Sequence, residues 1–197
     1  MDAKRDPDTS EGGASLNVAI MTRVALMAAV TAVAAQVTIP LPFSPVPFTL
    51  QVPAVVLTGL LLGPRYGALA QAVYVLVGAV GMPVFAGFKG GLGVIFGPTG
   101  GYLLSYPLAA AVAGLAAYAV ARSPRRRALT SGLLWGVAAL VVIYAIGATW
   151  LSVVAGLPPA VALTQGVLPF VVFDLVKVLL AALVAVGAAP AIAASRT

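Results

Sequence analysis

The sequence contains no cysteine and no histidine among its 197 residues. The first absence excludes disulfides and thiolate metal sites, and the second excludes imidazole ligands and any nucleophile that depends on a histidine base. Acidic residues are almost as rare, because Asp174 is the only one after Glu11. The usual catalytic pairs of side chains cannot be assembled from this set. We therefore predict that the protein is not an enzyme and that it has neither catalytic nor metal-binding residues.

Charge of either sign is scarce, and apolar residues dominate the composition. Only 8% of the residues are charged and 61% are hydrophobic, and the mean hydropathy is +1.09. A soluble domain carries far more charge on its surface. The net charge of +6 could suggest nucleic-acid binding, but the basic residues lie between apolar runs. The positive-inside rule of membrane proteins explains that placement better.

The apolar runs predict an all-α integral membrane protein with six transmembrane helices in one domain, residues 16–197. The predicted helices cover about residues 22–39, 52–62, 68–81, 102–121, 128–155 and 167–194. Residues 1–15 are polar and lack the basic region of a secretion signal, so we predict a disordered cytoplasmic tail there.

The sequence Gly63-Pro-Arg-Tyr-Gly67 separates the second and third predicted helices. One long kinked helix over residues 52–81 would leave Arg65 near the middle of the bilayer with no acidic partner, which is costly. A helical hairpin instead places Arg65 at the membrane surface. We therefore predict a hairpin whose short first arm is sheltered by its neighbours or extended by the preceding loop.

Three connections rich in proline or glycine, residues 40–51, 82–100 and 156–166, fall on one side of the predicted bundle. That side contains a single basic residue, Lys89. The opposite side collects Lys4, Arg5, Arg23, Arg65, four arginines between 122 and 127, and Arg196. This asymmetry predicts that both termini are cytoplasmic and that the irregular connections are outside. Their glycines and apolar side chains predict that they fold back over the helices as a lid.

Asp174 and Lys177 are one turn apart on the last predicted helix, about 10 Å below its outer end. An ionisable residue inside a membrane costs about 2.5–3.5 kcal/mol on insertion scales and usually marks a pathway or a ligand. We predict that this pair forms the floor of a pocket open to the outside. The carboxylate would accept N–H groups of a polar ligand head, and the ammonium would supply a donor. The alternative is an ion pair that only joins two helices.

Six further residues are candidates for lining such a pocket, and each has a simpler interpretation. Thr49 and Gln51 could contact the ligand or cap a helix. Lys89 could attract a carboxylate at the pocket mouth or be plainly solvated. Aromatic residues could form walls or belong to the interfacial belt. The aromatic candidates are Tyr74, Phe85 and Tyr102.

Several motifs, taken in order, resemble the BioY family, the biotin-specific substrate-binding (S) components of energy-coupling-factor transporters. The motifs are Pro45-Val-Pro-Phe-Thr-Leu-Gln51, Leu62-Gly-Pro-Arg-Tyr-Gly67, Gly81-Met-Pro-Val-Phe-Ala-Gly87 with Gly90-Gly91, Gly97-Pro-Thr-Gly-Gly-Tyr102 and Asp174-Leu-Val-Lys177. The similarity extends from about Arg23 to Ala182. The set of motifs is specific, although each one alone is weak.

The resemblance implies a six-helix S-component fold in the cell membrane that captures biotin from outside. It implies that Asp174 and Lys177 bind biotin together with residues of the first outer loop and the glycine-rich loop. It also implies a transmembrane coupling subunit carried by two ATPase subunits. The small-residue motif that contacts the coupling subunit falls on Ala25 and Ala29. No cofactor is expected, because the chain has no P-loop and ATP would be hydrolysed only by the partners.

The chain departs from the family pattern in the glycine-rich loop, where relatives often have Gly-Gly-Asn-Gly-Gly and this chain has Gly87-Phe-Lys-Gly-Gly91. Lys89 therefore stands in place of a neutral side chain. The alternative function is a self-sufficient secondary carrier that couples protonation of Asp174 to the uptake of a small carboxylate or vitamin. The lack of a second intramembrane acid for a proton relay counts against it.

Overall fold

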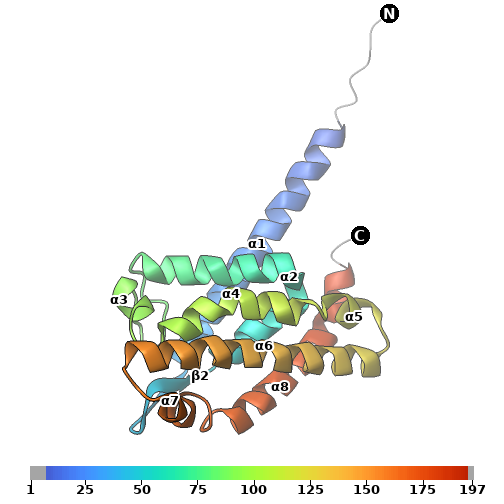
Figure 1. Ribbon diagram of the computed structural model, residues 1–197. Coiled ribbons are helices and arrows are strands. Elements are labelled where there is room, and N and C mark those ends of the chain that lie inside the picture. Colours follow the sequence, from blue (N-terminus) through green and yellow to red (C-terminus); the bar gives the residue numbers. More distant parts are fainter. Residues whose placement is uncertain (1–7, 195–197) are drawn as a thin grey trace, which may run out of the picture.

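The structure, a computed structural model, describes residues 8–194 of the chain and the side chains of residues 18–188. Long helices form a bundle, and two short strands pair at one end of it (Figure 1). In chain order the elements are α1 (Asp8–Gln36), β1 (Thr38–Leu41), β2 (Ser44–Thr49), α2 (Gln51–Ala79), α3 (Leu92–Ile95), α4 (Gly100–Gly114), α5 (Ala117–Arg122), α6 (Arg125–Val154), α7 (Pro159–Gly166) and α8 (Val171–Ala194).

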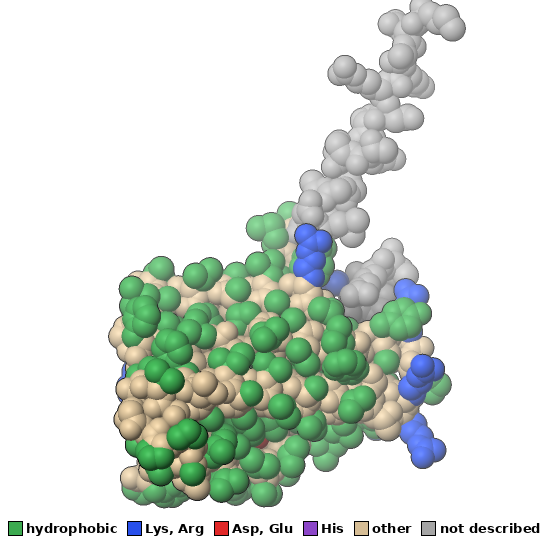
Figure 2. Space-filling view, in the orientation of Figure 1, with side chains coloured by type: hydrophobic (Ala, Val, Ile, Leu, Met, Phe, Trp, Pro, Cys, Tyr) green, Lys and Arg blue, Asp and Glu red, His purple; other side chains and the backbone are tan. Residues whose placement is uncertain are grey.

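The described helices include four that are long and apolar enough to cross a membrane, in residues 18–36, 51–79, 125–154 and 171–188. Large apolar side chains such as Leu134, Val141 and Val172 are exposed on them. Figure 2 shows hydrophobic side chains spread over the whole visible side of the bundle. A contiguous apolar surface of this extent suits lipid rather than water. The chain is thus a multi-pass membrane protein.

Helix α2 folds back on itself at Gly63, where φ is +80° and ψ is 177°. Gln71 in the second arm donates a hydrogen bond of 3.1 Å to the Thr58 hydroxyl in the first. These residues would lie about 20 Å apart in a straight helix. Arg65 is exposed at the turn, so the predicted hairpin is confirmed. With its two arms, residues 51–62 and 64–79, and with α4 and α5 taken as one span, the bundle has six helical spans among residues 8–194.

Glycines allow the hairpin to pack closely against α4. A methyl group on Gly59 would collide with the backbone of Ala110 and Gly114, and one on Gly114 would collide with Pro64. Valine and leucine side chains of the first arm, including Val55 and Leu60, are fully buried in the same core. The short first arm is therefore sheltered by its neighbours, as the sequence predicted.

Two helices differ most in extent from their predictions. Helix α1 begins at Asp8 and ends at Gln36, whereas residues 22–39 were predicted. It thus includes residues 8–15 of the predicted tail, and residues 1–7 lie outside the described part. The predicted span 102–121 is divided into α4 and α5, because Leu115 and Ala116 donate to carbonyls three residues back in a tighter turn.

The outer connections contain more regular structure than was predicted. The first forms an antiparallel hairpin in which Thr38 pairs with Thr49 and Ile39 with Phe48. Prolines are tolerated there because a two-stranded sheet leaves N–H positions unpaired along its edges. The third contains α7, whose N-terminal Pro158 and Pro159 occupy positions where no backbone donor is needed.

The two ends of the bundle differ in charge. Figure 1 places the β-hairpin, α3 and α7 at one end and α5 with the loop to α6 at the other. Lysine and arginine side chains gather at the α5 end (Figure 2). Exposed arginines of that end are Arg65, Arg122, Arg125, Arg126 and Arg127. The predicted Lys4, Arg5 and Arg196 lie outside the described side chains.

Candidate functional site

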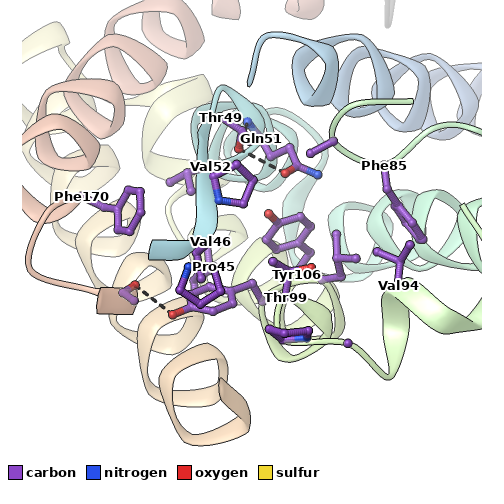
Figure 3. A pocket seen from close by; sticks show the side chains of 18 of the residues that line it. Pro45, Val46, Thr49, Gln51, Val52, Phe85, Val94, Thr99, Tyr106 and Phe170 are labelled. Atoms are coloured by element: carbon purple, nitrogen blue, oxygen red, sulfur yellow. Dashed lines mark hydrogen bonds between the residues drawn. The ribbon is translucent and has the colours of Figure 1, made fainter. Parts of the chain in front are cut away.

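The three outer connections enclose a cavity of about 300 Å³ at the end of the bundle that carries the β-hairpin. Its walls come from the hairpin, the start of α2, the segment between α2 and α4, the first turns of α4, the middle of α6, the end of α7 and the start of α8 (Figure 3). Of the eight predicted site residues, seven line it. These are Thr49, Gln51, Phe85, Lys89, Tyr102, Asp174 and Lys177.

Asp174 and Lys177 form a buried ion pair in the first turns of α8. The Lys177 Nζ lies 2.8 Å from Asp174 Oδ1, and only 3% and 7% of the two residues' surfaces are exposed, Asp174 first. Helix α8 begins at Val171, so Asp174 lies closer to the helix end than predicted. The carboxylate and the ammonium neutralise each other in a place where either alone would be costly.

The Lys177 ammonium is already occupied by the protein. Besides the carboxylate it donates 2.7 Å to the Thr49 carbonyl at the end of β2. Its Nζ also lies 3.5 Å from the centre of the Phe48 ring, a cation–π contact. These two hydrogen bonds and the ring contact hold the β-hairpin over α8, and they leave at most one of the three ammonium donors for a ligand.

The Asp174 carboxylate retains capacity to accept further hydrogen bonds. Its second oxygen, Oδ2, accepts 2.7 Å from the Tyr144 hydroxyl on α6. A carboxylate has about four acceptor positions, and Lys177 and Tyr144 use two of them. The remaining positions suit ligand N–H groups. Tyr144 was not predicted, because nothing near it in the sequence connects it with a residue thirty positions later.

A chain of hydrogen bonds continues from the ion pair to the glycine-rich segment. The Thr49 hydroxyl donates 3.1 Å to Gln51 Oε1, and Gln51 Nε2 donates 2.6 Å to the Tyr74 hydroxyl. Tyr74 then donates 3.2 Å to the Val84 carbonyl. Tyr74 is buried behind Gln51 and does not line the cavity. The prediction that Tyr74 contacts ligand is therefore corrected: it positions the amide that does face the cavity.

Aromatic side chains form much of the cavity wall. Tyr102 donates 2.8 Å to the Gly166 carbonyl and so fixes the end of α7. Phe85 is 1% exposed and packs edge-on against Tyr74. Tyr106 is 4% exposed and lines the cavity, and its hydroxyl has no hydrogen-bond partner among the described residues. Tyr106, which the sequence analysis missed, thus offers a free hydroxyl inside an apolar enclosure (Figure 3).

Lys89 lies at the rim of the cavity with an exposed side chain. Its carbonyl accepts 2.9 Å from the Phe85 backbone N–H, so the backbone here is ordered although the side chain is free to move. This position fits the predicted attraction of a ligand carboxylate at the mouth.

The remaining predictions concern partners and metals. Ala25 and Ala29 are exposed on α1 and lie outside the cavity wall, so they are accessible to another chain. Within the described residues no three His, Cys, Asp or Glu side chains come together as metal ligands would. The cavity therefore combines one carboxylate with spare acceptor positions, one free hydroxyl, apolar walls and a cation at the mouth. That chemistry suits an elongated ligand with N–H donors at one end.

Comparison with known proteins gives consistent matches along almost the whole described chain. The profile of the BioY family matches residues 8–194. A probable biotin transporter BioY of Pyrococcus horikoshii is 48% identical over 162 residues, which cover 82% of this chain and 91% of that protein. The biotin transporter BioY of Thermotoga maritima is 45% identical over 84% of this chain and 92% of that one.

A solved structure resembles the fold as well. The crystal structure of the S-component for biotin from an ECF-type ABC transporter superposes with a TM-score of 0.76 at 27% sequence identity. The match covers 87% of this chain and 91% of the other.

Proposed function

The chain belongs to the BioY family, and we propose that it is the biotin-binding S component of an energy-coupling-factor transporter. The observation that carries this function is the cavity whose floor is the Asp174–Lys177–Tyr144 cluster. Its volume of about 300 Å³ lies at the small end of the range for ligand pockets.

Biotin fits the chemistry of the cavity in one orientation. Its ureido ring has two N–H donors and one carbonyl, so the N–H groups would bind the free acceptor positions of Asp174. The carbonyl would accept from the Tyr106 hydroxyl, which is otherwise unpartnered. The thioether ring and aliphatic tail would pack between Phe85 and Tyr102, and the carboxylate would lie near Lys89 at the mouth. Closure of the outer connections would exclude water and strengthen each polar contact.

ATP-driven transport by this chain would require partners, because no P-loop occurs in the sequence. We place the transmembrane coupling subunit against the exposed Ala25 and Ala29 of α1, where small residues permit close helix packing. Two ATPase subunits would hydrolyse the ATP, and this chain would need no cofactor of its own. The arginine-rich end would face the cytoplasm together with both termini, and the cavity would face outwards.

Binding and uptake measurements test this function. The detergent-solubilised chain alone should bind labelled biotin, and vesicles containing the chain should accumulate biotin only when the coupling and ATPase subunits are present. Unlabelled biotin should compete for the site. Competition by desthiobiotin measures the contribution of the thioether ring, and competition by biotin methyl ester measures that of the carboxylate. Absence of binding by the folded chain would contradict the proposal. Accumulation by the chain alone that collapses with the proton gradient would favour a secondary carrier.

A further inference from the structure

Gln36, the last residue of α1, reaches across to the glycine-rich segment between α2 and α3. Its Nε2 donates 3.0 Å to the Ala32 carbonyl of its own helix and also lies 3.3 Å from the carbonyl oxygens of both Val84 and Phe85. Its Oε1 accepts 2.9 Å from the backbone N–H of Phe88. One side chain on the first helix thus binds three backbone groups about fifty residues away, although it does not line the cavity.

The segment that Gln36 binds forms part of the cavity wall. Phe85, Ala86 and Lys89 all face the cavity, and they lie within or next to the three bonded positions. The segment closes into a loop through the Phe85 N–H, which donates 2.9 Å to the Lys89 carbonyl. Its far end is tied to α2 by the Gly91 N–H, which donates 2.7 Å to the Gly78 carbonyl. Displacing residues 84–88 would therefore open the cavity on this side.

Phe88 shows that the loop needs an external hold. Its φ of +56° is in the left-handed region, which residues with a side chain rarely adopt. Its side chain is 71% exposed, so packing does not compensate for this conformation. A strained conformation persists only where surrounding contacts stabilise it. For Phe88 the described contact of this kind is the hydrogen bond from its N–H to Gln36 Oε1.

We propose that Gln36 is a positioning residue: by holding residues 84–88 it keeps the loop closed over the cavity and sets the residence time of the bound ligand. The proposal rests on the proposed function for the identity of that ligand. These contacts require an amide side chain of this length. Its NH2 group is the donor for the Val84 and Phe85 carbonyls, and its oxygen is the acceptor for the Phe88 N–H.

The first test uses the ligand-free protein. The chain has no cysteine, so Ala86→Cys introduces a single reporter for maleimide labelling in the loop. Adding Gln36→Leu should raise the labelling rate at least about fivefold, because three hydrogen bonds to the loop are lost. Gln165→Leu is the matched control, since Gln165 lies on the outer connection of α7, lines no part of the cavity and has no side-chain hydrogen bond among the described contacts.

The second test measures ligand residence in the chain without the reporter. Gln36→Leu should raise the biotin dissociation rate about tenfold, which corresponds to the loss of one or two net hydrogen bonds. Gln165→Leu should leave the rate unchanged. Gln36→Glu keeps the acceptor for Phe88 but places an oxygen against the Val84 and Phe85 carbonyls, which repel it, so this variant should also raise the dissociation rate. The thermal unfolding midpoint should stay close to wild type, because Gln36 is only half-buried and the substitution leaves the buried Phe85 side chain in place.

The outcomes are separable. Unchanged labelling and unchanged dissociation in Gln36→Leu would overturn the proposal, and so would changes that appear only together with a large drop in the unfolding midpoint. If Gln36→Leu fails to fold, the same criteria apply to Gln36→Glu. If the wild type binds no biotin, the proposed function fails, but the labelling arm still decides whether Gln36 holds the loop.

Discussion

Asp174 and Lys177 have two roles that mutation can separate. Each neutralises the other, and Asp174 also has acceptor positions free for a ligand. Two of the three donors of Lys177 form hydrogen bonds within the protein, and its ammonium also contacts the Phe48 ring. A structural ion pair predicts that removing both charges together is harmless. A binding site predicts that stability and ligand affinity respond differently to the same substitutions.

For Asp174→Asn we expect a loss of biotin affinity of at least tenfold, because a charge-assisted hydrogen bond contributes about 1.5–3 kcal/mol. The same substitution also leaves the Lys177 ammonium buried without its charged partner, which costs about 3–5 kcal/mol of stability. Titration calorimetry and thermal unfolding in detergent measure the two effects. The double variant Asp174→Asn/Lys177→Met should recover stability but not binding. Recovery of both would make the pair purely structural.

Tyr106 gives a second prediction at the scale of a single residue. Tyr106→Phe removes a hydroxyl that has no protein partner among the described residues, so the folded state should lose little stability. Biotin affinity should fall about tenfold through the loss of one ligand hydrogen bond. Tyr118→Phe is the matched control, because Tyr118 is 74% exposed at the opposite end. Equal affinities of the two variants would remove Tyr106 from the site.

Among the elements, the α2 hairpin decides where the site can form. Its turn brings together Gln51 in the first arm and Tyr74 in the second, so that Gln51 Nε2 lies 2.6 Å from the Tyr74 hydroxyl. This pairing supports Gln51 in the cavity wall and connects it with the glycine-rich segment. A continuous helix would have placed them about 34 Å apart. The site therefore depends on one residue, Gly63, that turns the chain.

For Gly63→Ala we expect a destabilisation of about 1–3 kcal/mol, because an alanine at φ +80° and ψ 177° is strained even though there is space for its methyl group. Gly187→Ala is the matched control: a methyl group there meets nothing within 4 Å, and alanine favours a helix by about 1 kcal/mol over glycine. Thermal unfolding in detergent should therefore move in opposite directions for the two variants. A shift in the same direction would contradict the strained turn.

Sequence patterns predicted helical elements well where composition alone determines them. Apolar runs located α6 and α8 and, through the cost of burying Arg65, the α2 hairpin. They did not predict the β-hairpin at residues 38–49, because four prolines within eight residues indicate a loop. The prolines are accommodated because this two-stranded sheet has free edges. Local patterns carry no information on such pairing.

For the whole molecule, the separation of charge between the two ends predicts one orientation in the membrane. Lys89→Cys should react in intact cells with a membrane-impermeant maleimide, because Lys89 is exposed at the cavity end. Ser123→Cys, between the arginines of the α5 end, should react only after permeabilisation. The unmodified chain is the background control because it has no cysteine. The reverse pattern would place the cavity in the cytoplasm and contradict capture from outside.

The composition by itself determined that this chain is a helical membrane protein, since a surface so poor in charge is stable only in lipid. The same scarcity made Asp174 conspicuous, because a lone intramembrane carboxylate has few structural explanations. Sequence order alone could not show that Lys177 is bound to the β-hairpin, that Tyr144 donates to the Asp174 carboxylate, or that the Tyr106 hydroxyl has no protein partner among the described residues. Those facts depend on which side chains from distant helices meet, and only the tertiary packing of α4, α6 and α8 with the β-hairpin decides that.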